Sequence, residues 1–511
     1  MSHEKTFIVG LLKNLDLGSS VAELDNLLET SRVETSAFND LLSDKVDLIP
    51  GTKGSGKSAL FRIFVDFLPD QLLHHRKVVI AHGVQKQGDN VFHAFKEQFA
   101  KLSEDEFVNF WCIYLVSLAH EQFIKGELYS PFLKNASKEI ESFRRACVKA
   151  KIPEIKAKKS LNEILVWTLY VLKSLTPKLS YSLPENGGEL SLDLFGNVPE
   201  PNSTHREETN NNLLPVDVRD IKNSLDLILK QADLSIWLMI DRLDEIFPRR
   251  SEIENNALRG LLRAMRIFAS ETIRVKVFLR DDMLEHIVSS GKGFTALTHI
   301  TARQTDTLRW SEDQILTIIV KRIFANQAFA NHLKIDVDRL EASLEYRREA
   351  FYKVFPETVH KGSRQSSTLN WIYSRTADGR GIVTPRDVID LLTRAKQKQH
   401  DDFSADSSGE SEWLIGPAAI RYGFAELSDR KRVTFLEAEF PHLWVHIKKF
   451  IGGKTEYSAA AMQNLLGKGW ETIVDDLISI GLISKKTRKK KRIYWFPFLW
   501  RKGLDLSQGS A

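Results

Sequence analysis

The stretch GTKGSGKSALFR at residues 51–62 constrains the fold of this chain more than any other feature. It follows the short apolar run of residues 45–49 and precedes apolar residues that recur at helical spacing. A strand, a glycine-rich turn and a helix form the context in which the pattern GxxxxGK[ST] binds phosphate groups. The glycines let the backbone N–H groups turn toward phosphate oxygens. We call residues 51–59 the phosphate loop: Gly51, Thr52, Lys53, Gly54, Ser55, Gly56, Lys57, Ser58 and Ala59.

This loop predicts a nucleoside triphosphate and Mg²⁺ as ligands. Lys57 has the position from which a lysine reaches the β and γ phosphates, and the Ser58 hydroxyl has the position of a Mg²⁺ ligand. A second metal ligand is expected where the near-continuous apolar run of residues 234–240, typical of a buried parallel strand, ends in Asp241. The alternative is an ordinary strand followed by an acidic turn.

Another predicted strand, residues 273–280, ends in Arg280. This arginine is either a sensor of the nucleotide or the partner of Asp281 or Asp282 in an ion pair at the strand end. A further short strand is expected at residues 305–310. Between the strands, residues 254–268 form an amphipathic pattern whose polar face carries arginines. These are either arginine fingers toward a neighbouring subunit or a solvated face: Arg259, Arg263 and Arg266.

The C-terminal part of the chain predicts a DNA-binding module. After a polar, serine-rich segment at residues 396–412, which we expect to be a linker, three helical patterns and two strands describe a winged helix. The tip between the strands is densely basic and suits duplex phosphates, but the last helix exposes Glu471, Asp475 and Asp476, which would repel them. A solvated loop or a protein-docking surface is the alternative. The basic residues are Lys485, Lys486, Arg488, Lys489, Lys490, Lys491 and Arg492.

Several of these motifs together resemble bacterial P-loop ATPases of the STAND and KAP groups, which are related to AAA+ proteins and are often encoded in defence or mobile loci. The motifs are the phosphate loop, IDRLDE, FLRDD, TLRWSEDQI and TPRDVIDLL, and the resemblance covers about residues 15–60 and 215–510. It implies ATP as the ligand. It also implies an ATPase that acts as a switch, in which slow hydrolysis resets a nucleotide-dependent assembly.

The resemblance also implies roles for individual residues. Arg242 stands where most AAA+ motors have a glutamate, and the acids come later in the pattern D-x-x-D-E. Asp244 would then orient the attacking water, with Glu245 as the alternative, and Arg280 would sense the γ-phosphate. Arg386, after Pro385 in a predicted helix start, would be a second sensor; proline at the first turn of a helix is also ordinary capping chemistry.

Composition sets the wider frame. With 511 residues the chain is expected to form about two to four domains. The net charge of +5 is small for this length, so a nucleic-acid site has to be local. Cys112 and Cys147 lack the spacing of a thiolate metal site, which favours a reducing compartment. No apolar run approaches the length of about 20 residues that spans a bilayer. We therefore expect a cytoplasmic protein without a membrane partner.

The predicted fold class is α/β: a P-loop ATPase core with a parallel sheet and a large helical insertion, then a helical lid and a C-terminal winged-helix domain. Expected partners are DNA, a co-encoded effector protein and further copies of the chain. A nucleotide-gated, initiator-like DNA-binding protein is the alternative function, and a small-molecule kinase has little support. The predicted boundaries are 1–84 and 231–310 for the core, 85–230 for the insertion with a mobile loop near 180–212, 311–400 for the lid, and 413–511 for the winged helix.

Overall fold

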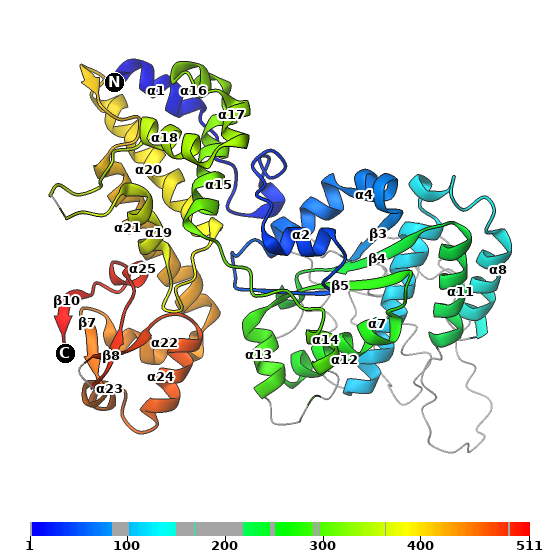
Figure 1. Ribbon diagram of the computed structural model, residues 1–511. Coiled ribbons are helices and arrows are strands. Elements are labelled where there is room, and N and C mark those ends of the chain that lie inside the picture. The colour runs from blue at the N-terminus through cyan, green and yellow to red at the C-terminus, as the bar shows by residue number, and fades with distance from the viewer. Residues whose placement is uncertain are drawn as a thin grey trace, which may run out of the picture. The chain divides into compact units, whose positions relative to one another are not determined.

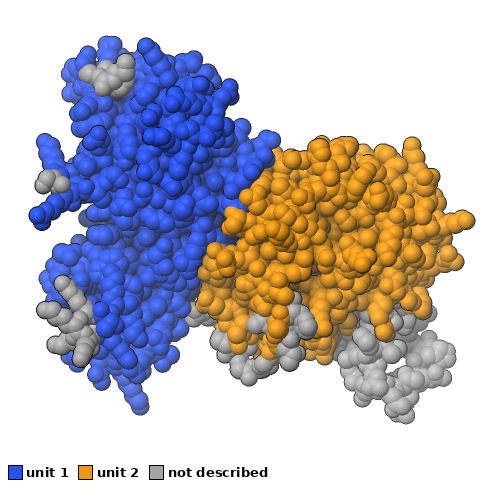
Figure 2. Space-filling model, viewed as in Figure 1, with its two compact units in different colours: residues 1–35, 52–59, 308–511 blue, residues 36–51, 60–307 orange. Residues whose placement is uncertain are grey.

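The computed structural model describes residues 3–83, 102–149, 168, 218–245, 251–289, 294, 297–362, 364–488 and 491–511. They form two compact units (Figure 2). Unit 1 comprises residues 1–35, 52–59 and 308–511, and unit 2 comprises residues 36–51 and 60–307. The predicted mobile loop near 180–212 lies outside the described residues, as do Lys489 and Lys490.

Unit 2 is built on a parallel four-stranded sheet in the order β2-β5-β4-β3 (Figure 1). The α/β fold class with a parallel sheet is therefore confirmed. The strands are almost entirely buried, as expected for a parallel sheet, and this explains their continuous apolar sequences. Their bounds are β2 Leu48–Gly51, β3 Val78–Gly83, β4 Ser235–Ile240 and β5 Ile273–Arg280.

Except for α2, the helices of unit 2 that follow β2 and the phosphate loop pack with the sheet into one hydrophobic core. The most buried of them, α7, starts with a complete capping box at Ser103 and Glu106. Its side chains contact the core directly, so this part of the predicted insertion belongs to the same core as the sheet. The helices are α2 Ser36–Leu42, α4 Pro69–Arg76, α7 Glu104–Ala119, α8 Ser137–Lys149, α11 Val218–Gln231, α12 Glu252–Phe268, α13 Asp281–Ser289 and α14 Leu297–Thr301. Helix α3, Lys57–Arg62, follows the phosphate loop.

The strand expected at residues 305–310 is absent. The chain makes one isolated bridge between Leu48 and Gln304, and the Thr305 amide donates to the Leu48 carbonyl before the chain leaves the sheet edge.

A fully buried cation, Lys276, lies in the middle of β5. Its ammonium group forms ion pairs with Asp44 and Asp47, donates to the Val46 carbonyl at 2.7 Å and lies 4.6 Å from the centre of the Trp237 ring. These partners offset the cost of taking the charge out of water.

Unit 1 is mainly helical. Its N-terminal helix α1 packs along the long helix α20, and both belong to one hydrophobic cluster that continues into the C-terminal helices. The helices are α1 Lys5–Asn14, α15 Glu312–Phe324, α16 Gln327–His332, α17 Val337–Ala342, α18 Leu344–Val354, α19 Thr368–Thr376, α20 Pro385–Ala405, α21 Pro417–Lys431, α22 Pro441–Ile447, α23 Ala459–Leu466, α24 Trp470–Ser479 and α25 Phe498–Arg501. The two-residue strands β1, His3–Glu4, and β6, Glu410–Ser411, pair with each other.

The C-terminal end of unit 1 carries a mixed four-stranded sheet in the order β10-β7-β9-β8. The hairpin that the sequence predicts is present as β8, Ser484–Arg488, and β9, Lys491–Trp495, and we call residues 484–495 the basic hairpin. The three predicted helices correspond to α22, α23 and α24. The inner strand β7, Lys454–Ser458, and the edge strand β10, Ser507–Ser510, were not predicted.

The linker expected at residues 396–412 is helical as far as Ala405, because α20 continues through it. Its polar side chains stabilise the helix rather than breaking it: Lys398 pairs with Asp402 one turn later, and Lys396 donates to the Leu15 carbonyl. Within the part of the chain that the structure describes, no helix is both long and apolar enough to cross a membrane.

Candidate functional site: the phosphate loop and the sheet edge

The phosphate loop has the backbone that its glycines predict. Gly54 and Gly56 have φ angles of 82° and 99°, which side-chain-bearing residues rarely adopt. The Ser55 amide donates to the Thr52 carbonyl at 3.2 Å and closes the turn. Lys57 is the first residue of α3, and its ammonium group donates to the Thr52 carbonyl at 2.9 Å. The lysine therefore lies folded along its own loop.

Two buried hydroxyl groups of the loop, those of Thr52 and Ser55, have no hydrogen-bond partner among the described residues. A buried polar group without a partner is costly and generally indicates a missing ligand or water. Together with the glycine backbone and Lys57, these hydroxyl groups fit the triphosphate that the sequence predicts. Ser58 and Ala59 are half-buried at the start of α3.

Trp310 lies against the loop and was missed by sequence reasoning. Its indole N–H donates to the Ser55 carbonyl at 2.7 Å, and a Cβ atom on Gly56 would lie 3.3 Å from its ring. Trp310 directly precedes the capping box of α15 and accepts a hydrogen bond on its carbonyl from Tyr373. A lone tryptophan beside a helix start was the available sequence signal.

Arg386, the predicted second sensor, also lies at the loop. A Cβ atom on Gly54 would lie 3.2 Å from the Cβ of Arg386 and 3.3 Å from the hydroxyl of Thr384. Thr384 caps α20 by accepting from the Asp387 amide, and Pro385 occupies the first turn. The Arg386 guanidinium donates to the Ser20 carbonyl at 3.1 Å. The helix start at Pro385 is thus capped as in ordinary helices, and Arg386 also lies beside the phosphate loop.

A third contact links the loop to the C-terminal helices. Lys53 forms an ion pair with Glu439, whose side chain is only 7% exposed and which directly precedes Phe440 and α22. Nothing in the sequence near Glu439 indicated this pairing.

In unit 2, the carboxyl ends of the parallel strands gather a second set of predicted residues. Gly51, the last residue of β2, lies opposite Arg280 in β5. Asp241 follows β4 and is 5% exposed. Arg242 is equally buried and has a φ angle of 63°, a strained conformation for a residue with a side chain. Glu245 ends the short 3₁₀ turn Leu243–Glu245.

Arg280 makes the strand-end ion pair that the sequence allowed as an alternative. Its guanidinium donates to both carboxylate oxygens of Asp282, at 2.9 and 2.8 Å, and to Asp244 at 3.5 Å. Burial by itself would lower the pKa of Arg280, but the two carboxylates outweigh it and raise the pKa. The charge of Arg280 is thus fixed. The same arginine connects strand β5 with the acid predicted to orient the attacking water.

Two of the candidate finger arginines make ion pairs within unit 2. Arg259 is buried, pairs with Glu104 at 2.7 Å and stacks 4.7 Å from the centre of the Phe294 ring. Arg263 pairs with Glu104 and Asp105, at 3.0 and 2.7 Å. Arg266 is exposed. The pairs of Arg259 and Arg263 hold α12 against α7, which is a structural role sufficient to explain both residues.

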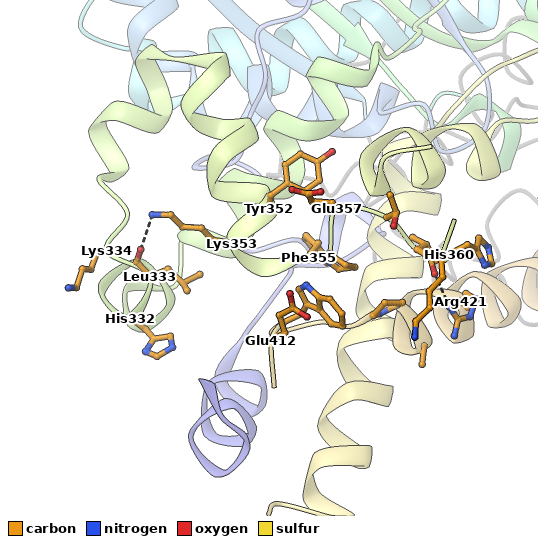
Figure 3. A pocket seen from close by; sticks show the side chains of 17 residues that line it. His332, Leu333, Lys334, Tyr352, Lys353, Phe355, Glu357, His360, Glu412 and Arg421 are labelled. Atoms are coloured by element: carbon orange, nitrogen blue, oxygen red, sulfur yellow. Dashed lines mark hydrogen bonds between the residues drawn. The ribbon is translucent and has the colours of Figure 1, made fainter. Parts of the chain in front are cut away.

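Unit 1 also holds a cavity of about 1090 Å³ that contains none of the predicted site residues (Figure 3). Basic side chains line this cavity, but two of them already donate hydrogen bonds to the backbone: Lys353 to the Leu333 carbonyl and Arg421 to the Val359 carbonyl. Glu357 and Glu412 line the same cavity and offset part of its positive charge.

The chain has low similarity to known proteins. No family model matches the chain, and no curated protein matches it. Among the solved structures that resemble it is "Structure of the Aeropyrum Pernix ORC2 protein (ADPNP-ADP complexes)", with 13% sequence identity, a TM-score of 0.39 and coverage of 93% of each chain.

Proposed function

We propose that this chain is an ATP-binding switch ATPase whose nucleotide state is coupled to the C-terminal helices and, through the basic hairpin, to DNA. The observation that carries the proposal is the set of contacts around the phosphate loop in unit 1. Trp310 from the start of the lid, Arg386 from α20 and Glu439 beside α22 all touch the loop. A phosphate group that engages the loop competes with or reinforces these contacts, and so acts on all three segments.

In this proposal the loop amides and Lys57 bind the phosphates, and the hydroxyl groups of Thr52 and Ser55 find acceptors there. Ser58 and Asp241 are the proposed ligands of Mg²⁺, which neutralises charge on the phosphate oxygens. Phosphoryl transfer to water then needs a residue that orients the water, and Asp244 or Glu245 has that role. Arg280 supplies a permanently charged sensor, because its pKa is raised.

The finer parts of the proposal rest on the sequence resemblance to STAND and KAP ATPases. They are slow hydrolysis, nucleotide-dependent self-assembly with Arg259, Arg263 or Arg266 as fingers, a co-encoded effector, a cytoplasmic location and a role in bacterial defence. The winged-helix assignment of residues 413–511 belongs here too, and its support is the order of α22, α23, α24 and the hairpin.

A second candidate is a nucleotide-gated DNA-binding protein whose main activity is binding rather than turnover. The hydrogen bond from Arg280 to Asp244 favours it, because the guanidinium group occupies a carboxylate oxygen that would otherwise accept a hydrogen bond from the attacking water. The two candidates differ in whether loss of hydrolysis alters ATP-dependent binding to DNA.

The first test is nucleotide binding by a Lys57→Ala variant. Removing a charged contact to phosphate costs about 1.5–3 kcal/mol, so we expect ATP affinity to fall by about 10- to 100-fold in calorimetric titration. Phosphate release should fall at least as much.

The control is Lys361→Ala, which removes an exposed lysine of unit 1 and should leave ATP affinity unchanged. If Lys57→Ala binds and hydrolyses ATP as well as the unaltered chain, both candidate functions are wrong.

A further inference from the structure

We propose that a row of alternating cations and aromatic rings, running from α19 to the basic hairpin, binds the phosphate backbone of duplex DNA. The row consists of Arg375, Phe498, Arg501, Trp495 and Lys486, and we call it the cation–aromatic row. The inference deepens the DNA engagement in the proposed function and rests on it, since it adds two arginines outside the hairpin and assigns the face that DNA contacts.

Three elements of unit 1 build the row. The guanidinium carbons of Arg375, from α19, and Arg501, from α25, lie 4.4 and 4.2 Å from the centre of the Phe498 ring. Arg501 also lies 5.0 Å from the centre of the Trp495 ring of β9, and the ammonium group of Lys486 in β8 lies 3.9 Å from the same centre. Each ring thus holds two cations in place.

Among the described residues, no ion pair includes Arg375, Arg501 or Lys486. Arg375 donates to the Ser374 hydroxyl at 3.4 Å, and Arg501 donates to the Phe496 carbonyl and to the Gln508 amide oxygen. Glu456 acts on Arg501 only through space. The row therefore carries a net positive charge that an anion would neutralise.

The burial of the two arginines makes this charge costly. Arg375 and Arg501 are both about half-buried, and burial together with the charge of Arg501 lowers the pKa of Arg375 to about 10. A bound phosphate favours the charged forms and removes the repulsion between the two guanidinium groups.

The rings are positioned for phosphate contact rather than for base stacking. Two guanidinium carbons within 4.4 Å of one ring centre occupy the space from which a base would approach Phe498. Single-strand binding sites need free aromatic faces. The row consequently suits the sequence-independent phosphate contacts of a duplex.

The register of the hairpin answers the objection raised by two acids of helix α24, Glu471 and Asp475. Successive residues of a strand point to opposite faces, and Tyr494 lies near Glu471 and Asp475 and contacts the Trp470 ring. Its neighbour Trp495 points to the other face. Lys485 pairs with Tyr494 and Ser484 with Trp495, so Lys486 shares the face of Trp495. Glu471 and Asp475 therefore lie on the opposite face of the sheet from the row.

The test is the binding of the full chain with ATP to a fluorescein-labelled, mixed-sequence 30-base-pair duplex, followed by anisotropy over a range of salt concentrations. In Arg375→Gln/Arg501→Gln we expect about 10-fold or greater loss of affinity at low salt. Each lost phosphate contact lowers the slope of log K against log salt by about 0.9, so the slope should fall by about 2. Arg375→Lys/Arg501→Lys keeps the charge and should restore most of the slope.

The matched control is Arg348→Gln. Arg348 is an exposed arginine of unit 1 that pairs with Asp313, and its substitution should not change the slope of log K against log salt.

A second comparison is Lys485→Gln/Arg492→Gln, on the other face of the hairpin. If this variant loses affinity while Arg375→Gln/Arg501→Gln does not, the proposal that the cation–aromatic row binds DNA is wrong, and the basic hairpin alone binds DNA. A preference for a 30-nucleotide single strand that depends on Arg375 and Arg501 overturns the duplex assignment. If the unaltered chain binds no duplex, both DNA proposals fail, whereas the Lys57→Ala test still decides nucleotide binding.

Discussion

In the proposed function, individual residues at the carboxyl edge of the parallel sheet determine whether ATP is hydrolysed or mainly bound. Asp244 is the proposed orienter of water, yet it accepts a hydrogen bond from Arg280. The Asp282 carboxylate accepts two hydrogen bonds from the Arg280 guanidinium, and these limit how closely Arg280 approaches Asp244. The weaker, 3.5 Å contact is the one that a nucleotide can exchange most easily.

We predict that Asp244→Asn keeps ATP binding but lowers the rate of phosphate release by about 100-fold, in the range expected for a residue that assists proton transfer. Binding is measured by calorimetry and turnover by phosphate release. Asp233→Asn, in the exposed turn before β4, is the control and should behave like the unaltered chain. Equal turnover in Asp244→Asn would move the role to Glu245. If DNA binding with ATP survives the loss of turnover, the binding-led candidate is favoured.

At the scale of elements, the loop of residues 378–382 packs on the end of α24. The Gly379 amide donates to the Gly481 carbonyl at 2.7 Å, and the Asp378 carboxylate accepts from the amides of Arg380 and Ile382. Burial raises the pKa of Asp378. A Cβ atom on Gly379 would lie 2.5 Å from the Ile483 carbonyl oxygen and 2.9 Å from that of Gly481. The glycine is needed because two backbone segments meet.

This contact predicts that Gly379→Ala destabilises the chain. The neighbouring atoms belong to the backbone and yield only by shifting, so overpacking should cost about 1–3 kcal/mol. A urea titration followed by tryptophan fluorescence would show a lower midpoint. Gly10→Ala, in α1 with nothing within 4 Å, is the control and should leave stability unchanged or raise it. An unchanged midpoint for Gly379→Ala would show that the loop does not depend on α24.

At the scale of the whole molecule, an ion pair couples the phosphate loop to the C-terminal helices. Lys53 and Glu439 join positions that are far apart in the sequence, and Glu439 is buried beside α22. Separating a buried acid from its cation costs free energy, so any ligand that draws Lys53 away from Glu439 changes the energy of the C-terminal segment.

We predict that Glu439→Gln binds ATP normally but loses most of the difference in DNA affinity between the ATP-bound and the ADP-bound chain. Anisotropy with each nucleotide measures this difference. Glu437→Gln, two residues away and paired with Arg432, is the control and should retain it. If Glu439→Gln shows the full difference, the ion pair does not carry the coupling.

The sequence of neighbouring residues was sufficient to predict many of the helices, strands and loops of this protein. The phosphate loop, the strands that end at Asp241 and Arg280, the capped helices and the basic hairpin depend on neighbouring residues, whose spacing determines the backbone. The errors also arose locally. Polar residues at 396–405 indicated a linker, although pairs one turn apart support a helix there, and the strand expected at 305–310 does not form.

Only the tertiary structure decided which distant side chains complete these motifs. Trp310 reaches Ser55, Glu439 reaches Lys53, and Asp282 rather than Asp281 holds Arg280. Folding also brought Arg375 of α19 and Arg501 of α25 to the same ring, and it put Glu471 and Asp475 of α24 on the other face of the hairpin. Such contacts join residues separated by as many as several hundred positions. Their specificity comes from packing and charge compensation in three dimensions, which no local pattern encodes.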